Sequence, residues 1–137
     1  MQIVCQFYLA VLSCYHIFSG GLSYFAGPAA MRFYKSFYGT DPVEQRHLRL
    51  ILKPWGALSI AVGIAGIAAA AHPAHHRATV FALWLLLVLR IGYRIACRHE
   101  LAVVSRVPAR RNAISILVLA CGATILGAWL LTNLLAR

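Results

Sequence analysis

The chain has 137 residues, of which 61% are hydrophobic, and its mean hydropathy is +0.75. A soluble domain is about half apolar, so this composition argues against a soluble globular protein. The formal net charge is +10, from 13 Lys and Arg against 3 Asp and Glu. These charges flank apolar segments, so we expect anionic membrane lipids as partners and no nucleic acid. The length predicts a single domain over residues 1–137.

Four apolar segments are each close to the ~20 residues that cross a bilayer core of ~30 Å as a helix. Backbone polar groups cannot face lipid unpaired, so each segment is predicted to be helical. The first is expected to be a true span rather than a cleaved signal, because no Lys or Arg precedes it. The predicted fold is therefore all-α, a polytopic membrane protein with a four-transmembrane-helix bundle. The expected spans are residues 3–25, 55–71, 78–97 and 113–135.

The first connection contains aromatic residues at i, i+1, i+4 and i+5, which places four rings on one helical face. This pattern predicts an interfacial amphipathic helix at residues 29–38, between spans one and two. Asp41, Pro42 and Glu44 then predict the start of a further helix, in which Pro54 either introduces a kink or begins the second span. The expected interfacial anchors are Phe33, Tyr34, Phe37, Tyr38 and Trp55.

The second span contains small residues at steps of three and four. Such spacing lets two helix backbones approach closely. The face is interpreted either as packing within the chain or as an interface with another subunit. Its members are Gly56, Ser59, Gly63, Gly66 and Ala70.

Basic residues indicate the orientation. Five lie in the first connection and five in or beside the third, whereas the opposite side carries Arg77 and Arg137. The positive-inside rule then places the two basic connections in the cytoplasm and both termini outside it. The Ala- and Arg-rich composition suggests a bacterial inner (plasma) membrane.

Polar side chains from three spans are predicted to share one depth. Counting ~1.5 Å per residue places His16, Ser59 and Arg90 in one layer, ~10 Å above the cytoplasmic boundary. Ionisable groups at membrane depth are costly and are functional candidates. Arg90 is interpreted either as structurally paired or snorkelling, or as contacting a lipid headgroup or a quinone carbonyl; snorkelling is the simpler reading of Arg94 and Arg98. The candidate ligand- or lipid-binding residues are His16, Ser59, Arg90, Tyr93, Arg94 and Arg98.

The sequence gives only weak signals for metal binding, catalysis or disulfide formation. His72, His75 and His76 are weak metal candidates, but no Cys, Asp or Glu nearby completes a site, so no metal is predicted. No catalytic motif is recognisable, so the chain is not expected to be an enzyme on its own, and a quinone or bound lipid is the one cofactor-like ligand considered. The four cysteines have no disulfide spacing and are expected to be small buried apolar residues.

The sequences GGLSYF at residues 20–25 and WGALSI at residues 55–60, together with the aromatic first connection, resemble the DoxX-like group of small four-span membrane proteins. The resemblance covers about the first half of the chain. It implies a four-helix bundle associated with membrane redox or quinone-linked complexes, and it transfers no catalytic residue.

Two functional hypotheses follow from the sequence. The leading one is a non-catalytic accessory or structural subunit of a larger membrane complex, such as a respiratory or redox complex, with other membrane subunits or further copies of the chain as partners. The alternative is a quinone- or lipid-binding membrane protein that uses the polar layer around His16 and Arg90.

Overall fold

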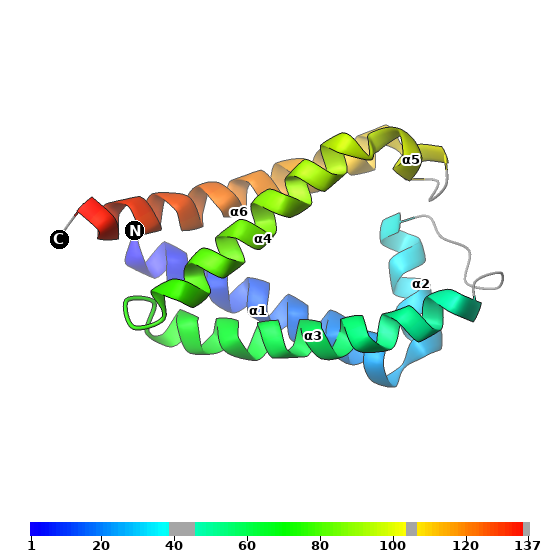
Figure 1. The fold of residues 1–137 in the computed structure, drawn as a ribbon, viewed down its shortest axis with the longest axis horizontal. Helices are drawn as coiled ribbons and strands as arrows, with labels where there is room; N and C mark the ends of the chain where they lie inside the picture. Colours follow the sequence, from blue (N-terminus) through cyan, green and yellow to red (C-terminus); the bar gives the residue numbers. More distant parts are fainter. Residues whose placement is uncertain (39–45, 104–106, 136–137) are drawn as a thin grey trace.

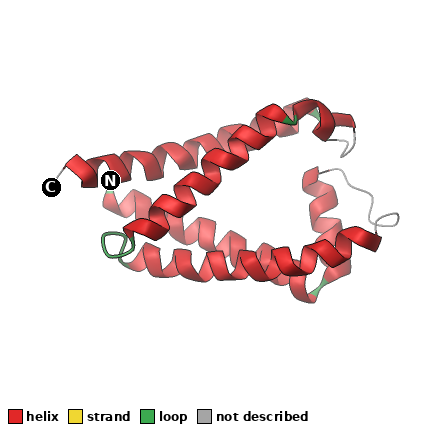
Figure 2. Ribbon diagram, viewed as in Figure 1, coloured by secondary structure: helices red, strands yellow, loops and turns green. Residues whose placement is uncertain are grey.

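The computed structural model describes residues 1–38, 46–103 and 107–135, and these residues form helices and short turns without a strand (Figures 1 and 2). Four helices are long and apolar enough to cross a membrane, which makes the chain an integral membrane protein and confirms the predicted all-α four-helix fold. In chain order the helices are α1 (Gln2–Phe25), α2 (Gly27–Tyr38), α3 (Arg46–Ala71), α4 (Arg77–Ala96), α5 (Arg98–Val103) and α6 (Ala109–Leu135).

The four long helices form two antiparallel pairs, α1 with α3 and α4 with α6 (Figure 1). The start of α1, the end of α6 and the turn between α3 and α4 lie at one end of the molecule, which we call the terminal end. The helices α2 and α5 lie at the opposite end, which we call the basic end. The two pairs diverge towards the basic end (Figure 1).

The pair of α1 and α3 is held together by close backbone contact. A Cβ atom built on Gly20 would lie 2.7 Å from the carbonyl oxygen of Gly56, and one built on Gly56 would lie 2.7 Å from that of Gly20. Gly63 lies against the backbone oxygen of Ser13 in the same way, and Gly66 lies against the Ser13 side chain. The small-residue face of the second span is therefore covered by α1, within the chain.

The buried apolar core joins all four long helices, but it occupies the terminal half of the molecule. It combines the first turns of α1 and α4 with the last turns of α3 and α6. Ala70, the last residue of the predicted small face, packs against this core. The buried residues of the core are Cys5, Leu9, Ala69, Val80, Leu83, Leu87, Leu126 and Trp129.

The cysteine prediction was wrong in part. All four thiols are free, and Cys5 is buried, but Cys14 and Cys121 are exposed. Both side chains are exposed on membrane-spanning helices, where lipid can reach them. Hydropathy alone does not separate a buried face from a lipid-facing one, because both are apolar.

The first connection contains a helix where one was predicted. α2 begins at Gly27, two residues before the expected start, and runs across the long axis of the molecule (Figure 1). The ring of Phe33 packs edge-on against Phe18 of α1, with ring centroids 6.0 Å apart, and Trp55 is exposed. The side chains of Tyr34, Phe37 and Tyr38, and the predicted helix start at residues 41–44, lie outside the described residues.

Prolines have different roles at the two basic connections. Pro54 lies inside α3, which continues from Arg46 through it, so Pro54 does not begin the second span. Val107 and Pro108 directly precede α6, which begins at Ala109. The short helix α5 before them was not predicted.

Candidate functional site

The polar layer begins on α1, where polar and small residues form a buried stripe that faces α3. Ser13, His16, Ser19 and Ser23 recur at steps of three and four residues, so they share one helical face. The serine hydroxyls of Ser13 and Ser23 donate to backbone carbonyls four residues earlier in α1. His16 is 3% exposed and is the titratable member of this stripe.

Two hydrogen bonds between α1 and α3 fix the state of the His16 ring. The hydroxyl of Ser59 donates to the backbone oxygen of His16 at 2.9 Å. The Nδ1 atom of His16 lies 3.0 Å from the same Ser59 Oγ. Since the hydroxyl has one hydrogen and uses it on the carbonyl, Nδ1 must carry a hydrogen and donate it. In the neutral ring, Nε2 is then a hydrogen-bond acceptor.

This acceptor is unpaired. His16 Nε2 is buried, and no described residue makes a hydrogen bond to it. Leaving a buried acceptor unsatisfied costs about 1–3 kcal/mol. The bonds that orient the ring therefore leave its second nitrogen ready to accept a hydrogen bond.

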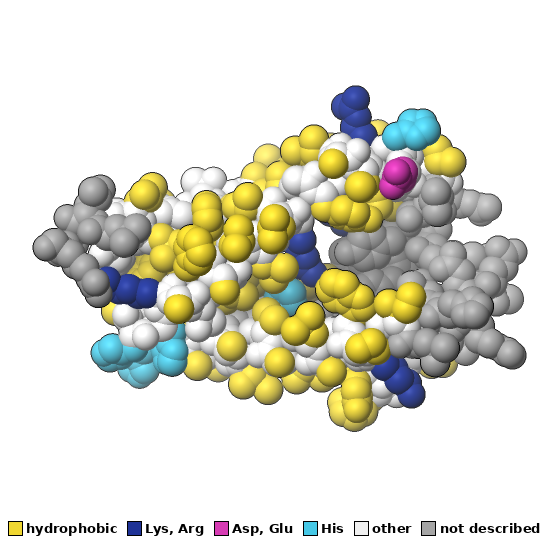
Figure 3. All heavy atoms as spheres, in the orientation of Figure 1, with side chains coloured by type: hydrophobic (Ala, Val, Ile, Leu, Met, Phe, Trp, Pro, Cys, Tyr) yellow, Lys and Arg dark blue, Asp and Glu magenta, His cyan; other side chains and the backbone are white. Residues whose placement is uncertain are grey.

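Arg90 of α4 lies within electrostatic range of His16. On the face drawn in Figure 3, one histidine and one basic side chain are visible near the middle of the molecule. Among the described residues none accepts a hydrogen bond from Arg90. The layer thus presents an acceptor on one helix pair and a guanidinium donor on the other.

Arg94 has a different role from the one predicted. Its Nη1 donates to Asn112 Oδ1 at 2.8 Å, and Asn112 Nδ2 donates to the Arg94 backbone oxygen at 3.1 Å. Asn112 is 8% exposed, so this reciprocal pair joins α4 to α6. The sequence analysis did not single out Asn112, although a polar residue one turn after Pro108 is the available signal.

The remaining candidates do not join the layer. Tyr93 and Arg98 are exposed, and no described contact links them to His16. His72, His75 and His76 form a tight turn in which the His75 and His76 amides both donate to the His72 oxygen. Within the described ranges, no three His, Cys, Asp or Glu side chains are grouped closely enough to hold a metal ion. The structure therefore brings together His16, Ser59 and Arg90.

Comparison with protein-family models, with curated proteins and with solved structures found no match. The resemblance to the DoxX-like group accordingly stays a prediction from its motifs. What the layer can bind has to be inferred from the chemistry of His16, Ser59 and Arg90.

Proposed function

We propose that the protein is a non-catalytic membrane protein that binds a quinol-class ligand in the polar layer of His16, Ser59 and Arg90. The observation that carries this proposal is the buried, unpaired Nε2 of His16, with the Arg90 guanidinium close enough to act on the ring electrostatically. A ligand for this layer must offer a hydrogen-bond donor to Nε2 and an acceptor to Arg90, and it must be stable in apolar surroundings.

A phenolic hydroxyl meets both requirements with one group. Its hydrogen is donated to Nε2, and its oxygen accepts from the guanidinium. A quinone carbonyl can accept a hydrogen bond from Arg90 but has no hydrogen to donate to Nε2. An ionised lipid phosphate has the same deficiency, so a lipid headgroup fits less well. The resemblance to DoxX-like proteins supports the same ligand class, because it implies an association with quinone-linked complexes.

The reduced ligand is therefore expected to bind more tightly than the oxidised one. The quinone leaves the buried Nε2 acceptor unsatisfied, which costs about 1–3 kcal/mol, so the quinol should bind roughly tenfold more tightly. The test is a calorimetric titration of the purified protein in mild detergent with a short-chain ubiquinol analogue, kept reduced, and with the matching quinone.

Variants distinguish the contribution of His16 to binding from that of Arg90. His16→Leu should abolish the preference for the quinol, whereas Arg90→Leu should weaken both forms. Arg98→Leu removes an exposed arginine at the basic end, outside the layer, and serves as the matched control. Equal affinity of the parent for quinol and quinone, or unchanged binding by both layer variants, would refute the proposal.

A second candidate is an accessory subunit of a larger membrane complex. It is favoured by Arg90, whose charge lies in a membrane-spanning helix without an acid partner among the described residues. A carboxylate of a neighbouring subunit could pair with it. The small-residue face of α3 no longer supports this reading, because α1 covers it. Mild-detergent purification followed by native mass spectrometry separates the candidates, since a bound small molecule favours the first and co-purifying polypeptides favour the second.

We also propose that the basic end faces the cytoplasm of a bacterial inner membrane and that both termini face outward. The support is the distribution of basic residues between the two ends. In a background without the native cysteines, Gln2→Cys and Ala74→Cys should react with a membrane-impermeant maleimide in whole cells. Ala109→Cys should react after lysis alone. The reverse labelling pattern would reject this orientation.

A further inference from the structure

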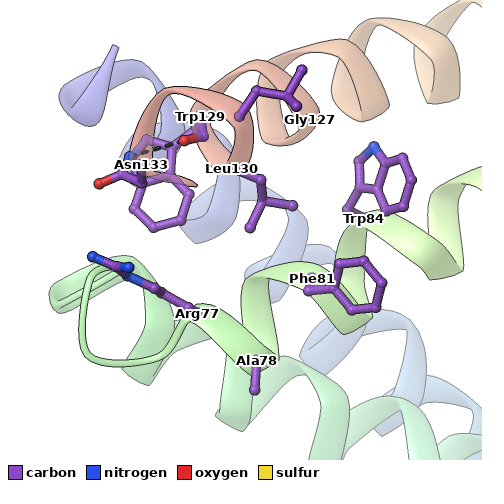
Figure 4. A pocket seen from close by; sticks show the side chains of 9 residues that line it. Arg77, Ala78, Phe81, Trp84, Gly127, Trp129, Leu130 and Asn133 are labelled. Carbon is purple, nitrogen blue, oxygen red and sulfur yellow. Dashed lines mark hydrogen bonds between the residues drawn. The ribbon is translucent and has the colours of Figure 1, made fainter. Parts of the chain in front are cut away.

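A cavity of about 470 Å³ lies at the terminal end, between the first turns of α4 and the last turns of α6 (Figure 4). This volume falls within the range of about 300–1,000 Å³ that is typical of ligand pockets. The cavity is separate from the polar layer. Its lining includes Arg77, Phe81 and Trp84 from α4 and Gly127, Leu131 and Asn133 from α6.

The lining changes from polar to apolar with depth. Figure 4 shows Arg77 and Asn133 at one end of the cavity and Phe81 and Trp84 at the other. Arg77 is the first residue of α4, at the edge of the span. At 1.5 Å per residue, Phe81 lies ~6 Å and Trp84 ~10 Å further into the membrane. The polar end thus stands at headgroup level and the apolar end among the acyl chains.

The polar end is suited to an anion. Arg77 Nε is buried and has no hydrogen-bond partner among the described residues. Arg77 and Ala78 open α4, whose N-terminus has no side-chain cap, so the positive end of the helix dipole lies at the same place. Within the described chain no acidic residue lines the cavity. Among the described residues, no acidic group of the lining neutralises the charge of Arg77.

Asn133 adds a hydrogen-bond acceptor at the mouth of the cavity. Its Nδ2 donates to the backbone oxygen of Trp129 at 2.8 Å, so the amide is held in place and its Oδ1 can accept. At the deep end, Trp84 lies against Gly127, where a built Cβ would stand 3.0 Å from the indole Nε1. The absence of a Cβ at Gly127 lets the indole ring lie close to the α6 backbone, so the ring forms part of the apolar wall of the cavity.

We propose that this cavity binds one anionic phospholipid with a hydroxyl-bearing headgroup. The phosphate lies at Arg77, a headgroup hydroxyl donates to Asn133 Oδ1, and one acyl chain runs past Phe81 and Trp84. A choline headgroup has no hydroxyl and brings its own cation near Arg77. Phosphatidylglycerol should therefore be preferred to phosphatidylcholine.

Tryptophan fluorescence provides the test, because Trp84 and Trp129 line the cavity whereas Trp55 is exposed near the basic end. Trp55→Phe removes the background emission. This protein is reconstituted in phosphatidylcholine nanodiscs that contain equal small fractions of chain-brominated phosphatidylglycerol or phosphatidylcholine. Brominated phosphatidylglycerol should quench the tryptophan emission as strongly as about a fivefold higher fraction of brominated phosphatidylcholine. This enrichment corresponds to the ~1 kcal/mol that one basic side chain contributes at an anionic lipid surface.

Matched variants decide whether Arg77 is responsible. Arg77→Gln should remove the preference, Arg77→Lys should keep most of it, and Arg98→Gln, at the basic end, should leave it unchanged. Equal quenching by the two brominated lipids in the parent would overturn the proposal. A preference that survives Arg77→Gln would overturn it as well. Should Arg77→Gln fail to reconstitute, Arg77→Lys decides. A preference for phosphatidylglycerol close to that of the parent supports the site, and loss of this preference overturns it.

Discussion

Replacing Gly56 with alanine should lower the free energy of unfolding by roughly 1–3 kcal/mol, the usual cost of overpacking a close contact. The new methyl carbon would lie 2.7 Å from the Gly20 oxygen and 2.8 Å from the Tyr24 nitrogen. Both are backbone atoms, so relief requires α1 and α3 to move apart. The measurement is reversible unfolding in mixed detergent micelles, followed by circular dichroism.

Two other helical glycines supply the controls. A Cβ atom built on Gly21 or on Gly92 meets nothing within 4 Å. Gly21→Ala and Gly92→Ala should therefore be neutral or stabilising by about 0.5–1 kcal/mol, because alanine loses less backbone entropy in a helix. If Gly56→Ala were as stable as Gly21→Ala, the close approach of α1 and α3 would be incorrect.

Asn112→Leu should lower the free energy of unfolding by roughly 1–3 kcal/mol, on the scale of two hydrogen bonds within a membrane protein. Leucine matches asparagine in size but can replace neither of the two bonds to Arg94. The Arg94 guanidinium would lose an acceptor in a half-buried position, which adds to the cost. The same unfolding assay applies, and a double-mutant cycle with Arg94→Leu isolates the coupling between the two residues.

Ser115→Ala is the matched control for Asn112→Leu. Ser115 lies one turn further along α6 and donates within its own helix, to the Arg111 oxygen at 3.0 Å, on an exposed face. Loss of this hydrogen bond should change the free energy of unfolding by no more than about 0.5 kcal/mol. A coupling energy near zero between Arg94 and Asn112 would show that this pair does not hold α4 against α6.

The sequence was sufficient to predict the spans and the members of the polar layer. Helical rise is constant and the bilayer core has a fixed thickness, so residue counting assigns a depth to each side chain. Counting placed His16, Ser59 and Arg90 at one level, and in the structure His16 is bonded to Ser59 and lies within electrostatic range of Arg90. Depth is thus accessible from sequence even without a related protein.

The sequence did not predict how each helix is rotated about its own axis, and so which of its faces meets a neighbouring helix. Lipid is as apolar as a leucine-rich interface, so hydropathy does not show which face meets a neighbour. This is why Cys14 was expected to be buried and is exposed. The same ambiguity hid the Arg94–Asn112 pair and the cavity beside Trp84, since both depend on how α4 and α6 face each other.

The largest buried cluster lies in the terminal half of the molecule and the helix pairs diverge towards the basic end, so the backbones of the long helices together form a wedge (Figure 1). A wedge occupies more area in one leaflet than in the other. A change in the angle between the helix pairs would mainly change the area that the protein occupies in the leaflet at the basic end. The area in the other leaflet would change little. If a ligand in the polar layer were to bind one such angle better than another, its affinity would depend on how tightly the lipids of that one leaflet are packed.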